Sequence, residues 1–209
     1  MSDGKSLLID TSKCSACRGC QVACKQWNGL PGSKTRNVGT YQNPPDLSAN
    51  TWKLVHFKEG QNEKGKPYWH FFPEQCRHCM DPPCMNGVNN EAVVYTDKKT
   101  GAVIYTARTK TVDFNEVLGY CPYNIPRQDK NTGEIRKCTL CIDRITNNDV
   151  PACVKTCPTG ATVFGERSDI LALAQKRVTA LVKIYPKAKA LDPETVRVIY
   201  IITDDQGTY

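Results

Sequence analysis

The stretch CSACRGCQVAC, residues 14 to 24, places four cysteines at the spacing C-x2-C-x2-C-x3-C. One tight C-x-x-C-x-x-C loop can present three thiolates to a single metal group while its backbone N–H groups turn toward the sulfurs. Cys24 follows Cys20 after three residues, and we expect it to start a helix and to point away from the loop. In ferredoxins with two clusters, the cysteine at this position ligates the other cluster. The run therefore predicts two neighbouring iron–sulfur clusters that share one loop.

Eight further cysteines repeat parts of this spacing later in the chain. Cys121 and Cys157 are each followed by proline, which fixes the backbone φ directly after a remote ligand. Pairing the cysteines by the two-cluster rule divides all twelve into three sets of four. The predicted sets are Cys14, Cys17, Cys20 and Cys157 for the first cluster, Cys24, Cys138, Cys141 and Cys153 for the second, and Cys76, Cys79, Cys84 and Cys121 for the third.

A complete second module of this kind would hold a fourth cluster, but its ligand positions carry other residues. Counted from Cys84 and Cys121, those positions are Val88, Val117, Phe114 and Thr111. All four ligands of the fourth cluster are absent together, whereas all four of the third are present. The second module is therefore predicted to have lost one whole cluster and to have kept the other.

Disulfide bonds and zinc ions are alternative uses for twelve cysteines in 209 residues. Cysteines three apart in one loop suit a metal group better than a link between distant segments. The pairs CRHC and CTLC alone would fit zinc equally well, but the run at 14–24 and the C-x3-C-P at 153–158 favour iron–sulfur clusters. A zinc-binding module, structural or bound to nucleic acid, is the remote alternative. His78 inside CRHC is interpreted as a neighbour of the ligands or a surface residue, because the cysteine set is complete without it.

Charge and hydropathy narrow the possible partners. Lys and Arg exceed Asp and Glu by 7, but they are scattered, and three oxidised cubane clusters of about −2 each would leave a net charge of about +1. No nucleic-acid partner is therefore expected. The most apolar stretch, 196–202, is much shorter than the roughly 20 residues of a membrane span. The first ten residues contain neither a secretory apolar segment nor a twin arginine, so the sequence predicts no membrane span and no export signal of its own.

The predicted fold class is α+β, with two ferredoxin-like iron–sulfur modules built from short strands, hairpins and short helices, plus a C-terminal helix–strand extension. Strands are predicted at 6–10, 52–57, 68–72, 92–96 and 102–106, the last two as a hairpin. Ser168 is expected to cap a helix that Pro186 ends, and 196–202 to form a buried strand. The predicted domains are 1–35 with 130–165 for the first module, 50–129 for the second module, and 166–209 for the extension, which packs on the core or on a catalytic subunit.

The cysteine architecture at 14–158 resembles the double-ferredoxin subunits that transfer electrons for molybdopterin oxidoreductases, with the last cluster deleted. Within that family, five motifs look most like the iron–sulfur (beta) subunit of soluble tungsten or molybdenum formate dehydrogenases of the sulfate-reducer type. These motifs are CSACRGCQVACKQWNG, QNPPDLS, FFPEQCRHCMDPPC, CPYNIPR and PACVKTCPTGA. The fourth cluster and the C-terminal membrane helix of membrane-anchored relatives are both missing from the pattern.

The resemblance implies an electron-transfer subunit with three [4Fe–4S] clusters and no catalytic site of its own. A separate large subunit with a tungsten or molybdenum bis-pterin cofactor would interconvert formate and carbon dioxide. The acceptor would be soluble, such as a multihaem cytochrome c or a ferredoxin, and the complex would be periplasmic through a signal-bearing partner, with a cytoplasmic location as the alternative. Service to another molybdopterin enzyme, such as a reductase for sulfur or nitrogen oxyanions, is the alternative function.

Overall fold

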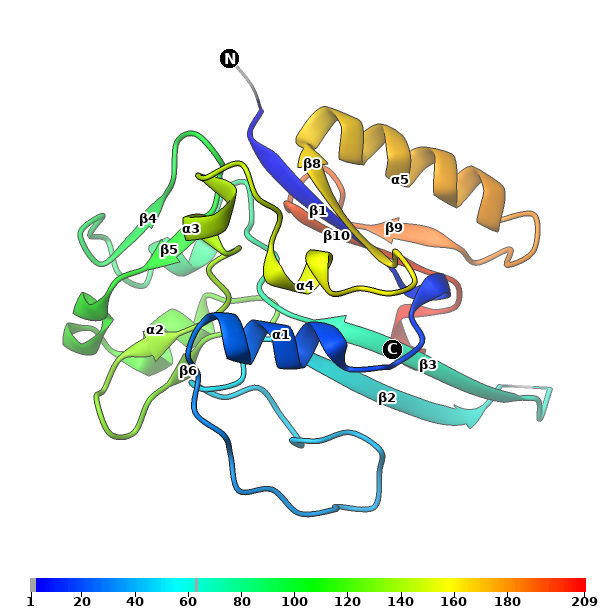
Figure 1. Cartoon of the computed structure of the whole chain (residues 1–209), viewed down its shortest axis with the longest axis horizontal. Coiled ribbons are helices and arrows are strands. Elements are labelled where there is room, and N and C mark those ends of the chain that lie inside the picture. The colour runs from blue at the N-terminus through cyan, green and yellow to red at the C-terminus, as the bar shows by residue number, and fades with distance from the viewer. Residues whose placement is uncertain (1–2, 63) are drawn as a thin grey trace.

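The computed structural model describes residues 3–62 and 64–209, and its largest sheet joins segments from both ends of the chain (Figure 1). The strands lie in the order β8 (Thr162–Glu166), β1 (Lys5–Asp10), β10 (Val198–Ile202) and β9 (Lys189–Leu191). β1 pairs in parallel with β10, and the two outer strands are antiparallel to their neighbours. The predicted strands at 6–10 and 196–202 are confirmed within two residues. All five residues of β10 are buried because it lies inside the sheet.

The two faces of this sheet belong to different cores, since successive side chains of a strand point to opposite faces. On one face, Leu8 and Ile199 pack with apolar residues of helix α5 (Arg167–Leu181). On the other face, Leu7 and Tyr200 pack with residues of the cysteine-bearing part of the chain, including Cys153. The sheet therefore connects the C-terminal extension to the region where the cysteines lie.

Helix α5 follows β8 directly, and its expected cap at Ser168 is wrong. The helix begins at Arg167, and Glu166, still paired to Lys5 in the sheet, is the residue that precedes it. The buried Arg167 guanidinium donates to the backbone carbonyl of Val196 at 2.7 Å, so the sheet sets the start of the helix. Ile170, Ala174 and Leu181 pack in the apolar core between the helix and the sheet. The helix ends at Leu181, before Pro186.

The remaining strands form three antiparallel hairpins. β2 (Leu54–Gln61) pairs with β3 (Pro67–Glu74), β4 (Val94–Thr96) with β5 (Val103–Tyr105), and β6 (Arg127–Gln128) with β7 (Ile135–Arg136). The strands predicted at 52–57 and 68–72 and the hairpin predicted between 92–96 and 102–106 are confirmed. Figure 1 shows the long β2–β3 hairpin beside α1 and the two shorter hairpins on the other side of the molecule.

Four short helices complete the fold: α1 (Gly19–Trp27), α2 (Phe114–Gly119), α3 (Ile142–Ile145) and α4 (Ala152–Lys155). α1 packs against α4, although the two are far apart in the sequence. Cys24 lies within α1 and does not start it, which corrects the expectation for this residue. The helix starts at Gly19 because Arg18 adopts a left-handed conformation with φ 59° and ends the preceding loop.

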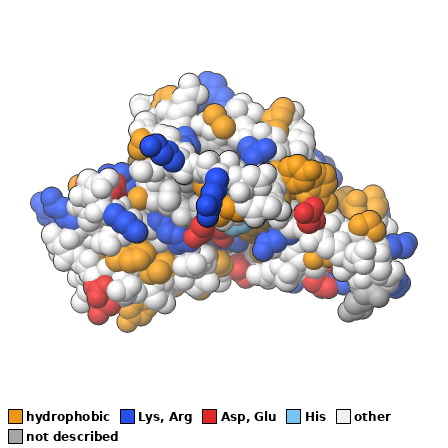
Figure 2. All heavy atoms as spheres, turned by 90° about the horizontal axis from the view of Figure 1, so that it is seen from below, with side chains coloured by type: hydrophobic (Ala, Val, Ile, Leu, Met, Phe, Trp, Pro, Cys, Tyr) orange, Lys and Arg blue, Asp and Glu red, His pale blue; other side chains and the backbone are white. Residues whose placement is uncertain are grey.

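The chain is thus a mixed α and β protein with short strands, small sheets and few helices, as the sequence predicts. Within residues 3–62 and 64–209, no helix has both the length and the apolar character needed to cross a membrane. On the face shown in Figure 2, Lys and Arg side chains are spread among acidic and hydrophobic ones. This distribution differs from the single basic face that nucleic-acid-binding domains typically present.

Candidate iron–sulfur sites

Three cavities in the protein are each lined by four cysteines, and the twelve lining cysteines fall into the three sets read from the sequence. The first cavity is lined by Cys14, Cys17, Cys20 and Cys157, the second by Cys24, Cys138, Cys141 and Cys153, and the third by Cys76, Cys79, Cys84 and Cys121. The space within each lining, counted together with its opening to solvent, is about 340, 320 and 340 Å³. The cavities share no cysteine, and their similar size suits three copies of one group.

The loops that carry the cysteines have the same local geometry. In the C-x-x-C segments that begin at Cys14, Cys76 and Cys138 the residue two positions after the first cysteine is left-handed: Ala16 has φ 55°, His78 has φ 48° and Leu140 has φ 57°. The N–H groups of His78 and Leu140 donate to the preceding cysteine sulfurs at 3.4 and 3.3 Å. Left-handed backbone is costly for residues other than glycine and persists where the surroundings demand it. Its repetition at one position indicates a shared requirement to turn backbone N–H groups toward sulfur.

The first and second cavities are held together by two helices. α1 contributes Cys20 to the first cavity and Cys24 to the second, and these residues are one helical turn apart, a rise of about 6 Å. At α4 the order is reversed, since Cys153 lines the second cavity and Cys157, just beyond the helix, lines the first. The packing of α1 on α4 therefore fixes the two cavities side by side.

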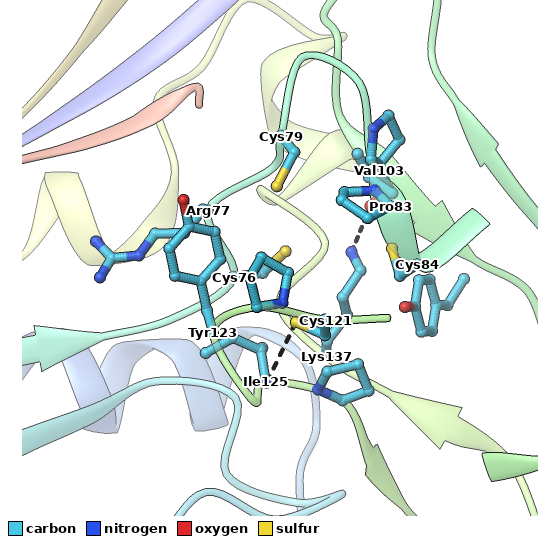
Figure 3. A pocket seen from close by; sticks show the side chains of 14 residues that line it. Cys76, Arg77, Cys79, Pro83, Cys84, Val103, Cys121, Tyr123, Ile125 and Lys137 are labelled. Atoms are coloured by element: carbon cyan, nitrogen blue, oxygen red, sulfur yellow. Dashed lines mark hydrogen bonds between the residues drawn. The ribbon is translucent and has the colours of Figure 1, made fainter. Parts of the chain in front are cut away.

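The third cavity is assembled from three separate segments (Figure 3). Cys76 and Cys79 come from the loop after β3, Cys84 from the 3₁₀ turn Pro83–Met85, and Cys121 from the loop after α2. The Ile125 N–H donates to the Cys121 sulfur at 3.5 Å. In Figure 3 the four sulfurs surround the cavity, and the aromatic ring of Tyr123 stands at its edge.

Burial separates the second cavity from the other two. All four of its cysteines are buried, whereas Cys17 of the first cavity is exposed and three cysteines of the third are half-buried. Burial is the main cause that raises the pKa of Cys138, followed by the thiolates of Cys24 and Cys141 and then that of Cys76. Because Cys76 belongs to the third set, the third cavity adjoins the second. The Cys153 thiolate has the same effect on Cys20 of the first cavity. The cavities thus form a row in which the central one is enclosed and the outer two approach the surface.

Burial raises the pKa of thiols in all three cavities. Burial raises the pKa of Cys24 to about 12 and that of Cys20 to about 11. For Cys157, burial acts in the same direction, but hydrogen bonds from Thr162 and Thr159 outweigh it and lower the pKa to about 7. Metal ligands must be deprotonated, so iron binding by these cysteines would be coupled to the release of thiol protons.

The residue that sequence reasoning missed is Lys53, which lines the second cavity and is only 1% exposed. Burial alone would lower the pKa of Lys53, but the thiolates of Cys153 and Cys20 reverse this and hold the pKa above its ordinary value. No spacing signal points to Lys53, since 22 residues separate it from the next cysteine, Cys76, and 28 from Cys24. Only the β2–β3 pairing brings its segment to the cavity.

The three lysines that adjoin cysteines in the sequence have different surroundings. Lys137, next to Cys138 of the second set, is 4% exposed and lines the third cavity, where its ammonium donates to the Val103 carbonyl at 2.6 Å (Figure 3). Lys25 donates to a backbone carbonyl outside the cavities. The Lys155 side chain is 66% exposed. Of the three, Lys137 is the one that lines a cysteine cavity.

His78 is fully buried, and its Nδ1 accepts a hydrogen bond from the Val103 N–H at 3.0 Å. This bond fixes the ring orientation and leaves Nδ1 engaged with backbone. The side chain therefore supports the loop between Cys76 and Cys79, in agreement with its interpretation as a neighbour of the ligands.

The four positions at which a fourth cluster would need cysteines lie mainly in an apolar core. Val117 is fully buried there with Cys84 and Val93, and Val88 and Phe114 pack against the same cluster. Thr111 instead turns its hydroxyl to a backbone carbonyl. Hydrophobic side chains thus fill the space near three of the four positions.

The residues around the cavities fit an anionic cluster with acceptor atoms. Gln75 lines the second cavity, and its buried amide nitrogen lacks a hydrogen-bond partner among the described residues; in the third cavity the buried Tyr105 hydroxyl lies beside the Cys84 sulfur. Buried donors of this kind normally have a partner, and sulfur atoms of a cluster can accept. Among residues 3–62 and 64–209, no three His, Cys, Asp or Glu side chains converge on one point as a single metal ion would require. The cysteines surround spaces instead.

These features define an iron–sulfur electron-transfer protein, and comparison with known proteins agrees. Residues 67–167 match the family model described as a 4Fe-4S dicluster domain. This segment contains the third set of cysteines and the remote cysteines of the other two.

The chain is similar over nearly its whole length to subunits of formate dehydrogenases. It is 49% identical to "Formate dehydrogenase 2 subunit beta (cytochrome c-553)" of Nitratidesulfovibrio vulgaris, covering 98% of this chain and 96% of the relative. It is 45% identical to the formate dehydrogenase subunit beta of Megalodesulfovibrio gigas, with the same coverage. Identity to the nitrate-inducible formate dehydrogenase iron-sulfur subunit of Escherichia coli is 37%, over 93% of this chain and 67% of that protein. The chain belongs to the family of iron–sulfur (beta) subunits of formate dehydrogenases and is an electron-transfer subunit of an oxidoreductase.

Proposed function

We propose that this subunit carries three [4Fe–4S] clusters, one in each cysteine-lined cavity, with the twelve cysteines as their ligands in the three sets given above. The observation that carries the proposal is the agreement between those sets and the cavity linings. The near-equal volumes and the repeated left-handed loop residues support one cluster type in all three. The apolar core around Val88, Phe114 and Val117 supports the loss of the fourth cluster.

We infer that electrons pass along the row of cavities, with the enclosed second cluster as the intermediate station. The outer two clusters would exchange electrons with partners, because their cysteines approach the surface. The same arrangement supports a first module at 1–35 and 130–165 with two clusters, a second at 50–129 with one, and an extension at 166–209.

One partner is proposed to be a catalytic subunit that interconverts formate and carbon dioxide at a tungsten or molybdenum bis-pterin centre. The names of the relatives as beta subunits support a separate partner of this kind. The other partner would be a soluble acceptor such as a multihaem cytochrome c or a ferredoxin, and the name of one relative includes a cytochrome c-553. A cytochrome of that type supports a periplasmic complex, exported with a signal-bearing partner.

Metal analysis separates this proposal from the zinc alternative. Three clusters predict about twelve iron atoms and about twelve sulfides per chain, with broad visible absorption. Zinc bound to four thiolates would give no such absorption. Stoichiometric zinc with little iron in protein purified without oxygen would refute the cluster proposal.

Addition of formate to the purified complex tests the substrate of the partner. Formate should bleach the visible absorption of the clusters, because reduction lowers their absorption, and an oxidised acceptor should restore it. Clusters that stay oxidised under formate while dithionite bleaches them would show that the catalytic subunit uses another substrate.

A further inference from the structure

A buried cation stands beside the second cavity without a carboxylate partner. Lys53 is 1% exposed, and its ammonium donates to the Gln75 side-chain oxygen and lies 3.5 Å from the Pro73 carbonyl. Within the part of the chain that the structure describes, none of the ion pairs includes Lys53. A buried charge is strongly unfavourable unless it is paired. Lys53 lines the second cavity and also lies close to Cys20 of the first, so the compensating negative charge belongs to these neighbouring cysteine sites.

The neighbouring Gln75 side chain presents a donor to the same cavity. It is also 1% exposed, and its amide orientation is determined by Lys53, because an ammonium can only donate and must face the oxygen. The amide nitrogen is then the other atom, and it has no partner among the described residues. Since Gln75 lines the second cavity, the free N–H group is available to an acceptor held there.

We propose that Lys53 and Gln75 form a pair that raises the reduction potential of the second cluster, with Gln75 donating to a cluster sulfur and Lys53 orienting the amide and supplying positive charge. The inference rests on the proposed function, because it needs a cluster in the second cavity. Reduction adds one electron, changes the charge from about −2 to about −3 and breaks no bond. A positive charge and an N–H donor stabilise the more negative form.

This role answers a problem that the burial of the second cavity creates. A low-dielectric surrounding disfavours the more highly charged reduced cluster, and all four cysteines of this set are buried. Without compensation, the central station of the row would be the hardest to reduce and would oppose electron flow between the outer two. The pair keeps the central cluster accessible to electrons from either side.

The test is a redox titration of the cluster-loaded complex, monitored by electron paramagnetic resonance. Lys53→Met removes the charge at similar side-chain length, and Gln75→Met removes the donor and changes no charge. Lys155→Met is the matched control, since it removes the same charge near Cys153 and Cys157 in the sequence from a side chain that is 66% exposed. The signal of the second cluster is identified as the one altered by Cys141→Ser.

Lys53→Met should lower the equilibrium constant for reduction of the second cluster at least tenfold, which is about 59 mV for a one-electron couple. Gln75→Met should lower the same equilibrium constant at least threefold, and Lys155→Met should change it less than twofold. Lys53→Arg keeps the positive charge and should therefore recover most of the decrease seen in Lys53→Met. Each protein must retain the iron content of the wild type. Should Lys53→Met fail to assemble, the potential of the Gln75→Met protein decides.

Two different failures can be told apart. A wild-type complex without a signal altered by Cys141→Ser, and with about eight iron atoms per chain, would refute the second cluster itself. In the other case the second cluster is fully present, but its reduction potential is the same in Gln75→Met as in Lys155→Met. That result would overturn the role of the pair and leave the proposed function standing.

Discussion

Replacing Cys121 by alanine tests the division of the cysteines into three sets. Cys121 lines only the third cavity, and none of the cysteines of that cavity lines either of the other two. The substitution removes one of the four thiolates around the third cavity and leaves the eight cysteines of the other two cavities intact. Iron should therefore fall from about twelve to about eight atoms per chain, a loss of one third, with sulfide falling in proportion.

The assay combines iron and sulfide analysis with low-temperature electron paramagnetic resonance of the reduced complex. Cys157→Ala is the matched control, because it removes a remote Cys-Pro ligand from the first cavity and should abolish a different signal. The α1–α4 pair holds the first two cavities and does not include Cys121, so both should load normally in the Cys121→Ala protein. If that protein kept the third signal and lost the first or second, the assignment of ligands would be wrong.

Three further substitutions test the surroundings of the cavities. Tyr200→Phe removes a buried hydroxyl that donates to the Pro73 carbonyl at 2.7 Å; a loss of about 1 kcal/mol should lower the melting temperature by about 2–4 °C, and an unchanged melting curve would contradict this. Gly101→Ala should lower the free energy of unfolding by more than about 1 kcal/mol, because Gly101 has φ +76° and a Cβ there would stand 2.0 Å from the Arg197 Nε. Denaturant unfolding measures this free energy, and equal stability of the two proteins would count against the contact. His78→Gln should leave iron at about twelve atoms, whereas loss of about four would make the histidine a ligand.

Local patterns accounted for the elements whose signals lie within a few residues. The strands at 6–10 and 196–202 and the hairpin at 92–106 were predictable because short apolar runs and turn residues act over short distances. The start of α5 was not predictable in this way. Ser168 satisfies the local rule for a helix cap, but the β8–β1 pairing extends the strand to Glu166, and the helix begins at the next residue. Cys24 likewise sits inside α1 because the left-handed Arg18 starts the helix earlier.

The grouping of cysteines was readable from spacing because a loop of a few residues determines which thiolates can reach a common centre. The surroundings of those thiolates depend on contacts between distant segments. Lys53 and Gln75 meet beside the second cavity through the β2–β3 pairing, and Lys137, adjacent in sequence to Cys138, turns to the third cavity instead. The proposed ligand sets follow from the spacing of the cysteines along the chain, whereas the charge and hydrogen bonds around them arise from packing that no local pattern records.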